Sequence, residues 1–220
     1  MTFSWTGFDW NLFIYVWSSV VLTAVVGWLL CRRASPDAPT VAQSIMEFVF
    51  EFIGDLARSS LDVDRDPVFL ELLVMIFLFL LVANFQGMIP YLHSPTSNLN
   101  VTAMLAIAVF VMMWYYGFRA HGLGYFGHWV HPGGPIGYVM LPINVIEDFS
   151  KPLTLAFRLF GNILVGEIFM EIIAKFGIYY FLGGFLAGFV WWSFTAFVNV
   201  VQAFIFMILT LSYVAQSQSH

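Results

Sequence analysis

Five stretches of this sequence are apolar for about the length that a membrane-crossing helix needs, and no other feature constrains the fold as strongly. A helix of about 20 apolar residues crosses a bilayer. The stretches that meet this requirement are residues 12–30, 68–89, 100–118, 143–176 and 185–213. Hydrophobic residues make up 60% of the 220 residues and charged residues only 10%, whereas about a quarter of a soluble domain is charged. We therefore expect an all-α polytopic membrane protein.

The last two stretches are longer than a perpendicular crossing requires, and both contain polar residues. Long helices of this kind fit a membrane when they are strongly tilted or follow a partner. A further helix is expected over residues 41–61, where apolar and charged positions alternate with helical spacing. It should lie on the membrane or against a partner instead of crossing. Its apolar positions are Ile45, Phe48, Phe52 and Leu56, and its charged positions are Glu47, Glu51, Asp55 and Arg58.

The chain is expected to form a single membrane domain with five parts. These are the first span and its connection (1–40), the amphipathic helix (41–66), a helical hairpin (67–119), a loop (120–140) and two long tilted helices (141–220). No basic residue precedes Arg32, and no small-residue cleavage site follows the first apolar stretch, so this stretch should remain as a span.

Positive charges predict the orientation, because they accumulate on the cytoplasmic side of a membrane protein. If the N-terminus lies outside, five crossings leave the C-terminus in the cytoplasm, and Lys175 is then the basic residue that falls outside. The residues that fall inside are Arg32, Arg33, Arg58, Arg65, Arg119 and Lys151.

Several classes of function are disfavoured. The eight Lys and Arg form no basic patch, which argues against binding of nucleic acid. A single cysteine, Cys31, leaves neither an internal disulfide nor a cysteine-rich zinc site. No Gly-rich nucleotide loop is present. His121, His128 and His131 could form a metal cluster, but the Gly and Pro residues around them favour a flexible connection. We expect no metal and no cofactor.

Arg158 is the most informative residue, because it lies deep inside the apolar stretch 143–176. An arginine in the middle of a membrane helix costs about 2.5–3.5 kcal/mol on insertion scales, and its side chain stays protonated. Such a charge requires a water-lined path or an anionic partner. The structural alternatives are a snorkelling side chain and an ion pair between helices, and the depth of Arg158 argues against snorkelling.

Helical spacing divides the polar residues around Arg158 into two regions. At 100° per residue, Asn162 lies about 40° from Arg158, on the same face. Glu167 points to roughly the opposite side of the helix and begins an i, i+4 series. Water could reach this series from the outer end of the membrane. Alternatively, the series could simply mark a helix end at the membrane surface. That series is Glu167, Glu171 and Lys175, and a second series at the inner end is Glu147, Lys151, Thr154 and Arg158.

The stretch 185–213 carries a polar stripe of its own. Thr195, Asn199 and Gln202 recur there with helical spacing. Such a stripe can hydrogen-bond water and Arg158, or it can hold packed helices together. Asn162 has the same two interpretations.

These motifs together resemble the subunit a family of F-type ATP synthases, over nearly the whole chain from about residue 41. The central motif is Lys151-Pro152-Leu153-Thr154, then Arg158-Leu159-Phe160-Gly161-Asn162, then Gly166-Glu167. Residues 202–206 (Gln-Ala-Phe-Ile-Phe) resemble the C-terminal motif of the family. Residues 94–102 and 142–147, and Pro90 at the end of a span, are supporting matches.

The resemblance implies a non-catalytic stator subunit in the cell inner membrane, with two half-channels that load and unload protons, or Na⁺, on c-ring carboxylates. Its implied partners are the c-ring, the peripheral-stalk subunit b and other ATP synthase subunits, and its last two helices would be tilted against the ring. Arg158 would face the ring carboxylate and block a direct leak. Asn162 and Gln202 would hydrate or position the site, and Glu167 would serve the outer half-channel.

The chain departs from the family pattern at two positions. Some members have a His where this chain has Thr195, which makes Glu171 a candidate for the second polar group beside Glu167. Some members have an inner acid where this chain has Asn144, which makes Glu147 or Asp148 the candidate there. The candidate ion-translocating residues are therefore Arg158, Asn162, Glu167, Gln202, Glu171, Asn199 and Glu147.

Two other classes of function remain open at this point. A secondary transporter or channel could use Arg158 to bind an anionic substrate, although that class often has internal repeats and none is visible here. A membrane metalloenzyme could use the loop histidines, but the sequence lacks a set of His and Glu ligands within the membrane. Subunit a should purify with a c-ring, whereas a transporter should be stable alone or as a homo-oligomer.

Overall fold

All of the regular secondary structure in the described part of the chain is helical. The computed structural model describes residues 10–31, 41–60, 67–89, 92–122, 124, 135–179 and 181–219. In chain order the elements are α1 (Trp10–Cys31), α2 (Val41–Ser60), α3 (Pro67–Gln86), the short 3₁₀ helix η2 (Pro95–Ser97), α4 (Leu99–His121), α5 (Pro135–Tyr179) and α6 (Phe181–Ser219). The all-α fold predicted from the sequence is confirmed.

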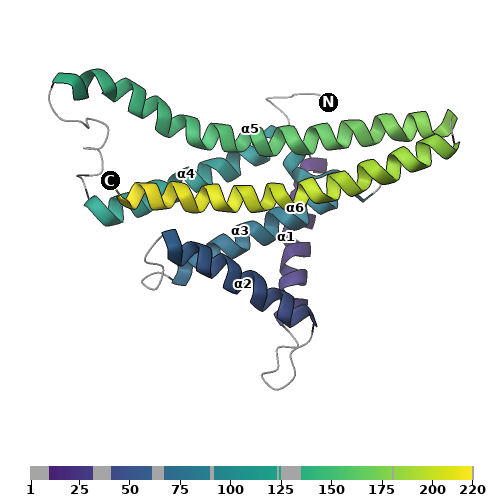
Figure 1. Ribbon diagram of the computed structural model, residues 1–220, viewed down its shortest axis with the longest axis horizontal. Coiled ribbons are helices and arrows are strands. Elements are labelled where there is room, and N and C mark those ends of the chain that lie inside the picture. Colours follow the sequence, from purple (N-terminus) through teal and green to yellow (C-terminus); the bar gives the residue numbers. More distant parts are fainter. Residues whose placement is uncertain are drawn as a thin grey trace.

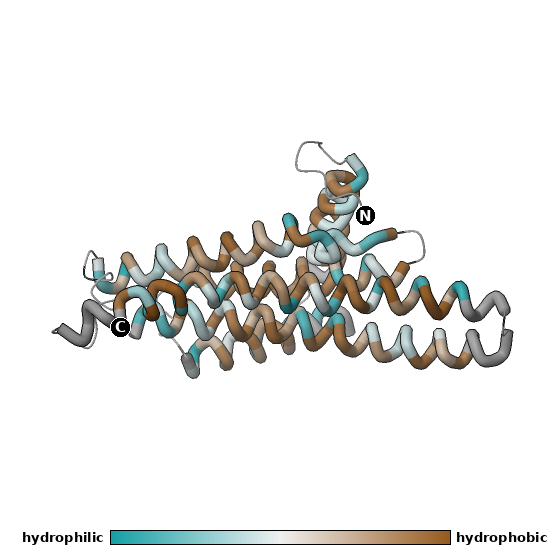
Figure 2. The backbone as a smooth tube through the Cα atoms, turned by 90° about the horizontal axis from the view of Figure 1, so that it is seen from above, coloured by the Kyte–Doolittle hydropathy of each residue, from teal (hydrophilic) through white to brown (hydrophobic). Residues whose placement is uncertain are grey.

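Five of these helices are long and apolar enough to cross a membrane, as the sequence predicted. The spans are Trp10–Leu29, Pro67–Gln86, Leu99–His121, Leu141–Lys175 and Leu186–Gln218. Figure 2 shows hydrophobic residues along most of each long helix, with hydrophilic residues at the ends and at a few internal positions. The protein is therefore a polytopic membrane protein.

The two last helices form a long antiparallel pair (Figure 1). They contain 45 and 39 residues, which correspond to about 67 and 58 Å at 1.5 Å per residue. Both lengths are about twice the thickness of the hydrocarbon core. Helices of this length fit a bilayer when they are strongly tilted, and α1 crosses the direction of the pair in Figure 1.

The connection between α4 and α5 is shorter in the structure than the range 120–140 assigned to it. Helix α4 continues to His121, and α5 already begins at Pro135. A proline suits the first position of a helix, because the N–H that it lacks would have no helical partner there. Pro142 and Pro152 lie inside α5, where each removes a helical hydrogen bond, and Figure 1 shows that this part of α5 is bent.

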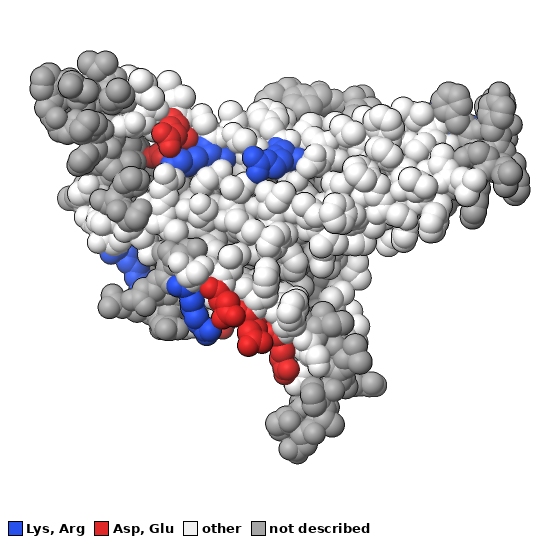
Figure 3. Space-filling view, in the orientation of Figure 1, with Lys and Arg blue, Asp and Glu red and all other residues white. Residues whose placement is uncertain are grey.

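The amphipathic helix α2 packs differently from the pattern that the sequence suggested. Ile53 and Ala57 are buried against α3 and α6, while Phe48 and Phe52 are exposed and stack on each other with ring centroids 6.1 Å apart. Figure 3 shows a row of acidic and basic side chains along α2. The helix thus presents both an apolar and a charged exposed surface, as expected for an element at the membrane boundary.

A buried apolar cluster fixes the rotation of α5 about its own axis. Leu155, Leu159 and Ile163 of α5 pack against Leu80 of α3 and Phe206 of α6, and each of these side chains is at most 5% exposed. Burying a large aliphatic side chain contributes about 1.5–3 kcal/mol. With these three positions held in the core, the opposite face of α5 must point away from the bundle.

Candidate functional site

Arg158 lies on the outward-pointing face of α5. Its side chain is exposed, and it makes no hydrogen bond and no ion pair with any residue in the described part of the chain. Its charge acts on the Tyr213 hydroxyl of α6. An arginine at membrane depth needs an anionic partner or water, so what stabilises Arg158 must come largely from outside the described chain.

The exposed face of α5 around Arg158 carries both polar and apolar side chains. Thr154 and Asn162, one turn before and one turn after Arg158, are exposed, and so are Leu153 (57%) and Phe157 (51%). Figure 3 shows basic side chains on the α5 part of a face that is otherwise mostly uncharged. A fixed positive charge on a helix face that also exposes apolar side chains is suited to a hydrophobic partner that carries an anionic group.

Asn162 and Gln202 join α5 to α6 one helical turn beyond Arg158. The Asn162 Nδ2 atom donates a hydrogen bond of 2.7 Å to Oε1 of Gln202. Asn162 is exposed, whereas Gln202 is 1% exposed. The Gln202 Nε2 atom has no hydrogen-bond partner in the described structure. Because buried polar atoms normally have a partner, the N–H groups of this amide are suited to donate to water or to a carboxylate beside Arg158.

Glu167 faces the loop between α3 and η2, on a different side of α5. Its Oε1 atom accepts a 2.8 Å hydrogen bond from the Ser94 backbone N–H, and its Oε2 atom lies 3.7 Å from Nδ1 of His93. Gly87 makes this approach possible, since a Cβ atom there would lie 3.0 Å from Glu167 Oε1 and 2.8 Å from Ser94 Cβ. The carboxylate is 18% exposed, so water reaches one side of it.

A chain of buried hydrogen bonds leads from this loop into the bundle. The hydroxyls of Ser94 and Thr96 are 2.6 Å apart, and the Thr96 hydroxyl donates to Oδ1 of Asn84 at 2.9 Å. Asn84 and Asn199 each donate a side-chain N–H to the backbone carbonyl of the other, at 3.4 and 3.1 Å. Residues of α3, η2 and α6 are thus linked from the neighbourhood of Glu167 to the polar stripe of α6.

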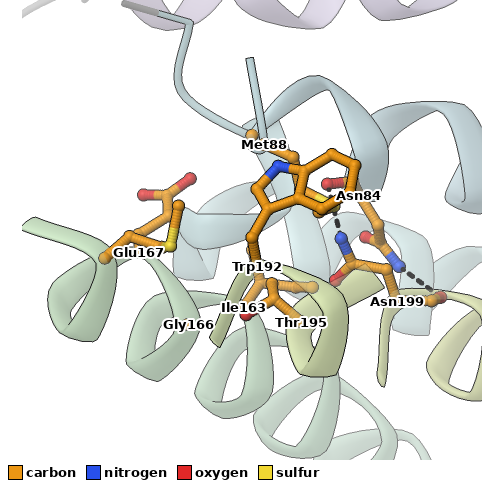
Figure 4. Close-up of a pocket in the computed structure, with 10 residues that line it drawn as sticks. Asn84, Met88, Ile163, Gly166, Glu167, Trp192, Thr195 and Asn199 are labelled. Carbon is orange, nitrogen blue, oxygen red and sulfur yellow. Dashed lines mark hydrogen bonds between the residues drawn. The ribbon is translucent and has the colours of Figure 1, made fainter. Parts of the chain in front are cut away.

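A small pocket lies between Glu167 and the two asparagines (Figure 4). Its volume of about 20 Å³ is enough for about one water molecule. Glu167, Asn84, Asn199 and Thr195 are among its lining residues, and the Thr195 hydroxyl is buried without a hydrogen-bond partner in the described structure. In Figure 4 the Trp192 ring stands between Glu167 and the asparagines. The pocket therefore combines a carboxylate, a hydroxyl and two amides.

Ion pairs occupy both ends of the polar part of α5. Toward its start, Lys151 Nζ lies 2.9 Å from Asp148 and 3.8 Å from Glu147. Asp148 is buried, whereas the Glu147 side chain is 61% exposed. Toward its end, Lys175 Nζ lies 2.8 Å from Glu171, and the Glu171 side chain is 68% exposed. Charged groups therefore lie on both sides of Arg158 along the helix, and all of these pairs are local to α5.

The structure brings some of the predicted residues together and separates others. Asn162 and Gln202 are in direct contact, and Asn199 and Glu167 line the same pocket. Glu171 is paired with Lys175, and the group beside Glu167 is His93. In the described structure no hydrogen bond joins Arg158 to Gln202 or Asn199, and Asn199 instead bonds the Asn84 carbonyl of α3.

Sequence reasoning missed the contributions of the loop and of α3. Asn84, His93, Ser94 and Thr96 were not singled out as functional, although residues 94–102 were a supporting motif. The available signal in the sequence was a Ser and a Thr on either side of a proline, between two apolar stretches. Of the loop histidines, His121 ends α4 and its Nε2 atom lies 3.0 Å from the Gln218 carbonyl, while His128 and His131 lie outside the described residues.

Comparison with known proteins agrees with this arrangement. Residues 13–215 match the family model of the ATP synthase A chain. The chain is also 35% identical, over 211 residues, to the ATP synthase subunit a of Desulforamulus reducens, and the alignment covers 94% of this chain and 79% of that relative. Matches of this extent show that the chain belongs to the ATP synthase A chain family, the ion-translocating and non-catalytic stator subunits of the ATP synthase membrane sector.

Proposed function

We propose that the chain provides two ion half-channels beside a c-ring and uses Arg158 to separate them. The observation that carries this proposal is the exposed Arg158 in the middle of a membrane-spanning helix, with no hydrogen bond or ion pair in the described part of the chain. A rotor carboxylate that passes this face would meet a permanent positive charge in a medium of low dielectric. The attraction between unit charges is strong there, so the carboxylate would lose its proton before it passes Arg158.

The proposed outer half-channel passes Glu167. This carboxylate is partly exposed, and behind it lies a pocket for about one water molecule, lined by Thr195, Asn199 and Asn84. Gln202 and Asn162 continue the polar groups toward Arg158. A proton could thus move from the outer surface to Glu167 and then, through water and polar side chains, to the face that the rotor covers.

The proposed inner half-channel begins near the start of α5. Glu147 is exposed, and it shares Lys151 with the buried Asp148. These three residues and Arg158 lie on the same helix, and Ser150 and Thr154 are exposed polar residues between them. The two acids would exchange protons with the cytoplasm, and Lys151 would hold their carboxylates close together. The proposal applies to H⁺ and equally to Na⁺, because the rotor carboxylate site lies on another chain.

We also propose how the protein sits in the cell and what it contacts. The distribution of basic residues favours an N-terminus outside and a C-terminus in the cytoplasm, in the cell inner membrane. The exposed face of α5 and α6 would contact the c-ring. The exposed surface of α2, with its charged row (Figure 3), is suited to the peripheral-stalk subunit b at the membrane boundary.

The proposal is tested by comparing wild type with Arg158→Ala in vesicles that contain the assembled ATP synthase. We expect ATP-driven acidification to be lost, because nothing would then force the rotor carboxylate to release its proton. Passive proton leak should rise if Arg158 also separates the half-channels. The control is Arg119→Ala, which removes an exposed arginine in the last turn of α4 and which should keep pumping. Normal pumping by assembled Arg158→Ala would exclude the proposal.

A further inference from the structure

His93 is the histidine that lies beside Glu167 in the described structure. Its Nδ1 atom lies 3.7 Å from Glu167 Oε2, and its side chain is 69% exposed whereas that of Glu167 is 18% exposed. The imidazole of histidine is the side chain that ordinarily gains and loses a proton between pH 5 and 8. A water-exposed imidazole, that of His93, therefore lies next to the largely buried carboxylate of Glu167.

The backbone around His93 is held firmly even though the ring is exposed. The next residue, Ser94, is 2% exposed, donates its N–H to Glu167 at 2.8 Å and donates its hydroxyl to the Ala83 carbonyl at 2.9 Å. On the other side of the ring, Tyr15 of α1 makes an edge contact with centroids 5.9 Å apart. The imidazole is thus kept beside Glu167 by its neighbours while most of its surface is open to water.

Other charged groups near His93 come from α5. Glu171 senses the His93 charge, and Lys175 neutralises Glu171 through an ion pair of 2.8 Å. The described groups that face the imidazole are then Glu167 and Glu171 on α5, with Lys175 behind them, and the Tyr15 ring on α1. Of these, Glu167 is the acid without a lysine partner in the described structure.

We propose that His93 exchanges protons between the outer aqueous phase and Glu167. Protonated His93 gives the proton on Nδ1 to Oε2 of Glu167, which leaves a neutral imidazole and a carboxylic acid. The neutral ring then takes a proton from water or from a buffer acid outside, and the reverse sequence releases protons during ATP-driven pumping. A shift of less than 1 Å brings the two atoms from 3.7 Å into hydrogen-bond distance, which proton transfer requires.

This role rests on the proposed function, because it makes His93 the entry group of the outer half-channel. It concerns a residue of the α3–α4 connection, whereas the half-channel residues inferred above lie on membrane helices. It also explains why the polar loop packs on α5 through Ser94, since that contact sets the distance between the two titratable groups.

The experiment uses the complete ATP synthase in liposomes and follows the membrane potential that ATP hydrolysis generates. A permeant base such as imidazole does not collapse a membrane potential, whereas it would collapse a pH gradient. We expect assembled His93→Ala to pump about 10-fold more slowly at neutral pH, less than the 10²-fold typical of a lost general acid, because Glu167 keeps some contact with water. Added imidazole should restore most of the rate to His93→Ala and leave wild type unchanged.

Two controls make the result interpretable. His121→Ala removes an exposed histidine at the opposite end of α4 and should pump at the wild-type rate. In a Glu167→Gln background, His93→Ala should cause no further loss, because the acceptor of its proton is already absent. A normal rate for His93→Ala, a loss that imidazole does not restore, or an additive loss in the double variant would each overturn the relay.

Arg158→Ala in the same preparation separates the two proposals. If it fails to pump while His93→Ala pumps normally, the half-channel function stands and the relay is wrong. If Arg158→Ala pumps, the proposed function itself is wrong.

Discussion

The Asn162 side chain donates a 2.7 Å hydrogen bond to Gln202, and this bond crosses between α5 and α6 one turn from Arg158. The bond holds the Gln202 carbonyl oxygen toward α5 and leaves the Gln202 N–H groups for a water or a carboxylate. The region next to Arg158 is therefore polar on both helices.

Gln202→Leu should slow ATP-driven pumping about five-fold, with coupling retained. The substitution removes one interhelical hydrogen bond, which contributes about 1 kcal/mol, and a buried amide that can bind water. It leaves Arg158 in place, so the effect should be milder than that of Arg158→Ala. The measurement is the initial rate of acidification per assembled complex, and a complete loss of pumping would contradict this interpretation.

Glu167→Gln should slow proton exchange with the outer side about 10-fold, without increasing passive leak. The amide keeps the size of the side chain and can still accept from the Ser94 N–H, but it cannot carry a proton as a carboxylate does. Acidification rate and leak would be measured in the same vesicles. Glu71→Gln, which changes an exposed acid on α3, is the control and should behave like wild type.

Gly87→Ala should impair both stability and pumping. The added Cβ would lie 2.8 Å from the Ser94 Cβ and 3.2 Å from its backbone N, so the loop must move away from Glu167. Overpacking of this kind costs about 1–3 kcal/mol. The readouts are the thermal stability of the complex in detergent and the pumping rate. Gly27→Ala has no atom within 4 Å of the new Cβ and should change neither, and equal behaviour of the two variants would argue against the close approach.

Asn199→Leu should destabilise the packing of α6 on α3. The substitution leaves the Asn84 carbonyl without the 3.1 Å bond that it accepts from Asn199, and an unsatisfied buried polar group costs about 1–3 kcal/mol. A lower thermal midpoint of the purified complex would be the expected result. Ser193→Ala on the same helix loses only a hydrogen bond to the Phe189 carbonyl at an exposed position, and it should leave the midpoint close to that of wild type.

The membrane helices and the face of α5 that carries Arg158 could be predicted from the sequence, because both depend on local patterns. Apolar length predicted the five spans, and the 100° rotation per residue put Arg158 and Asn162 on one side of α5. The connection was assigned the range 120–140 because Pro135 was interpreted as part of a flexible segment, although a proline also favours the first turn of a helix.

The surroundings of Glu167 were not predictable in the same way. Ser94 and Glu167 are 73 residues apart in sequence, and helical periodicity does not say which loop packs on which helix face. Because this chain has Thr195 where some family members have a His, the second polar group beside Glu167 was not expected from α6. Glu171 was the candidate for that group because it lies on the same helix as Glu167. The tertiary fold instead supplies His93 from the loop between α3 and α4.

The exposed Arg158 also bears on how the complex is put together. A guanidinium that faces lipid alone is unfavourable by at least about 2.5 kcal/mol, whereas the same group beside a membrane-embedded carboxylate is stabilised. The apolar side chains exposed around it would adhere to many hydrophobic helices, but only a neighbour with a carboxylate at the matching depth relieves the charge. The residue proposed to control proton release thus also selects which protein can cover this side of the molecule.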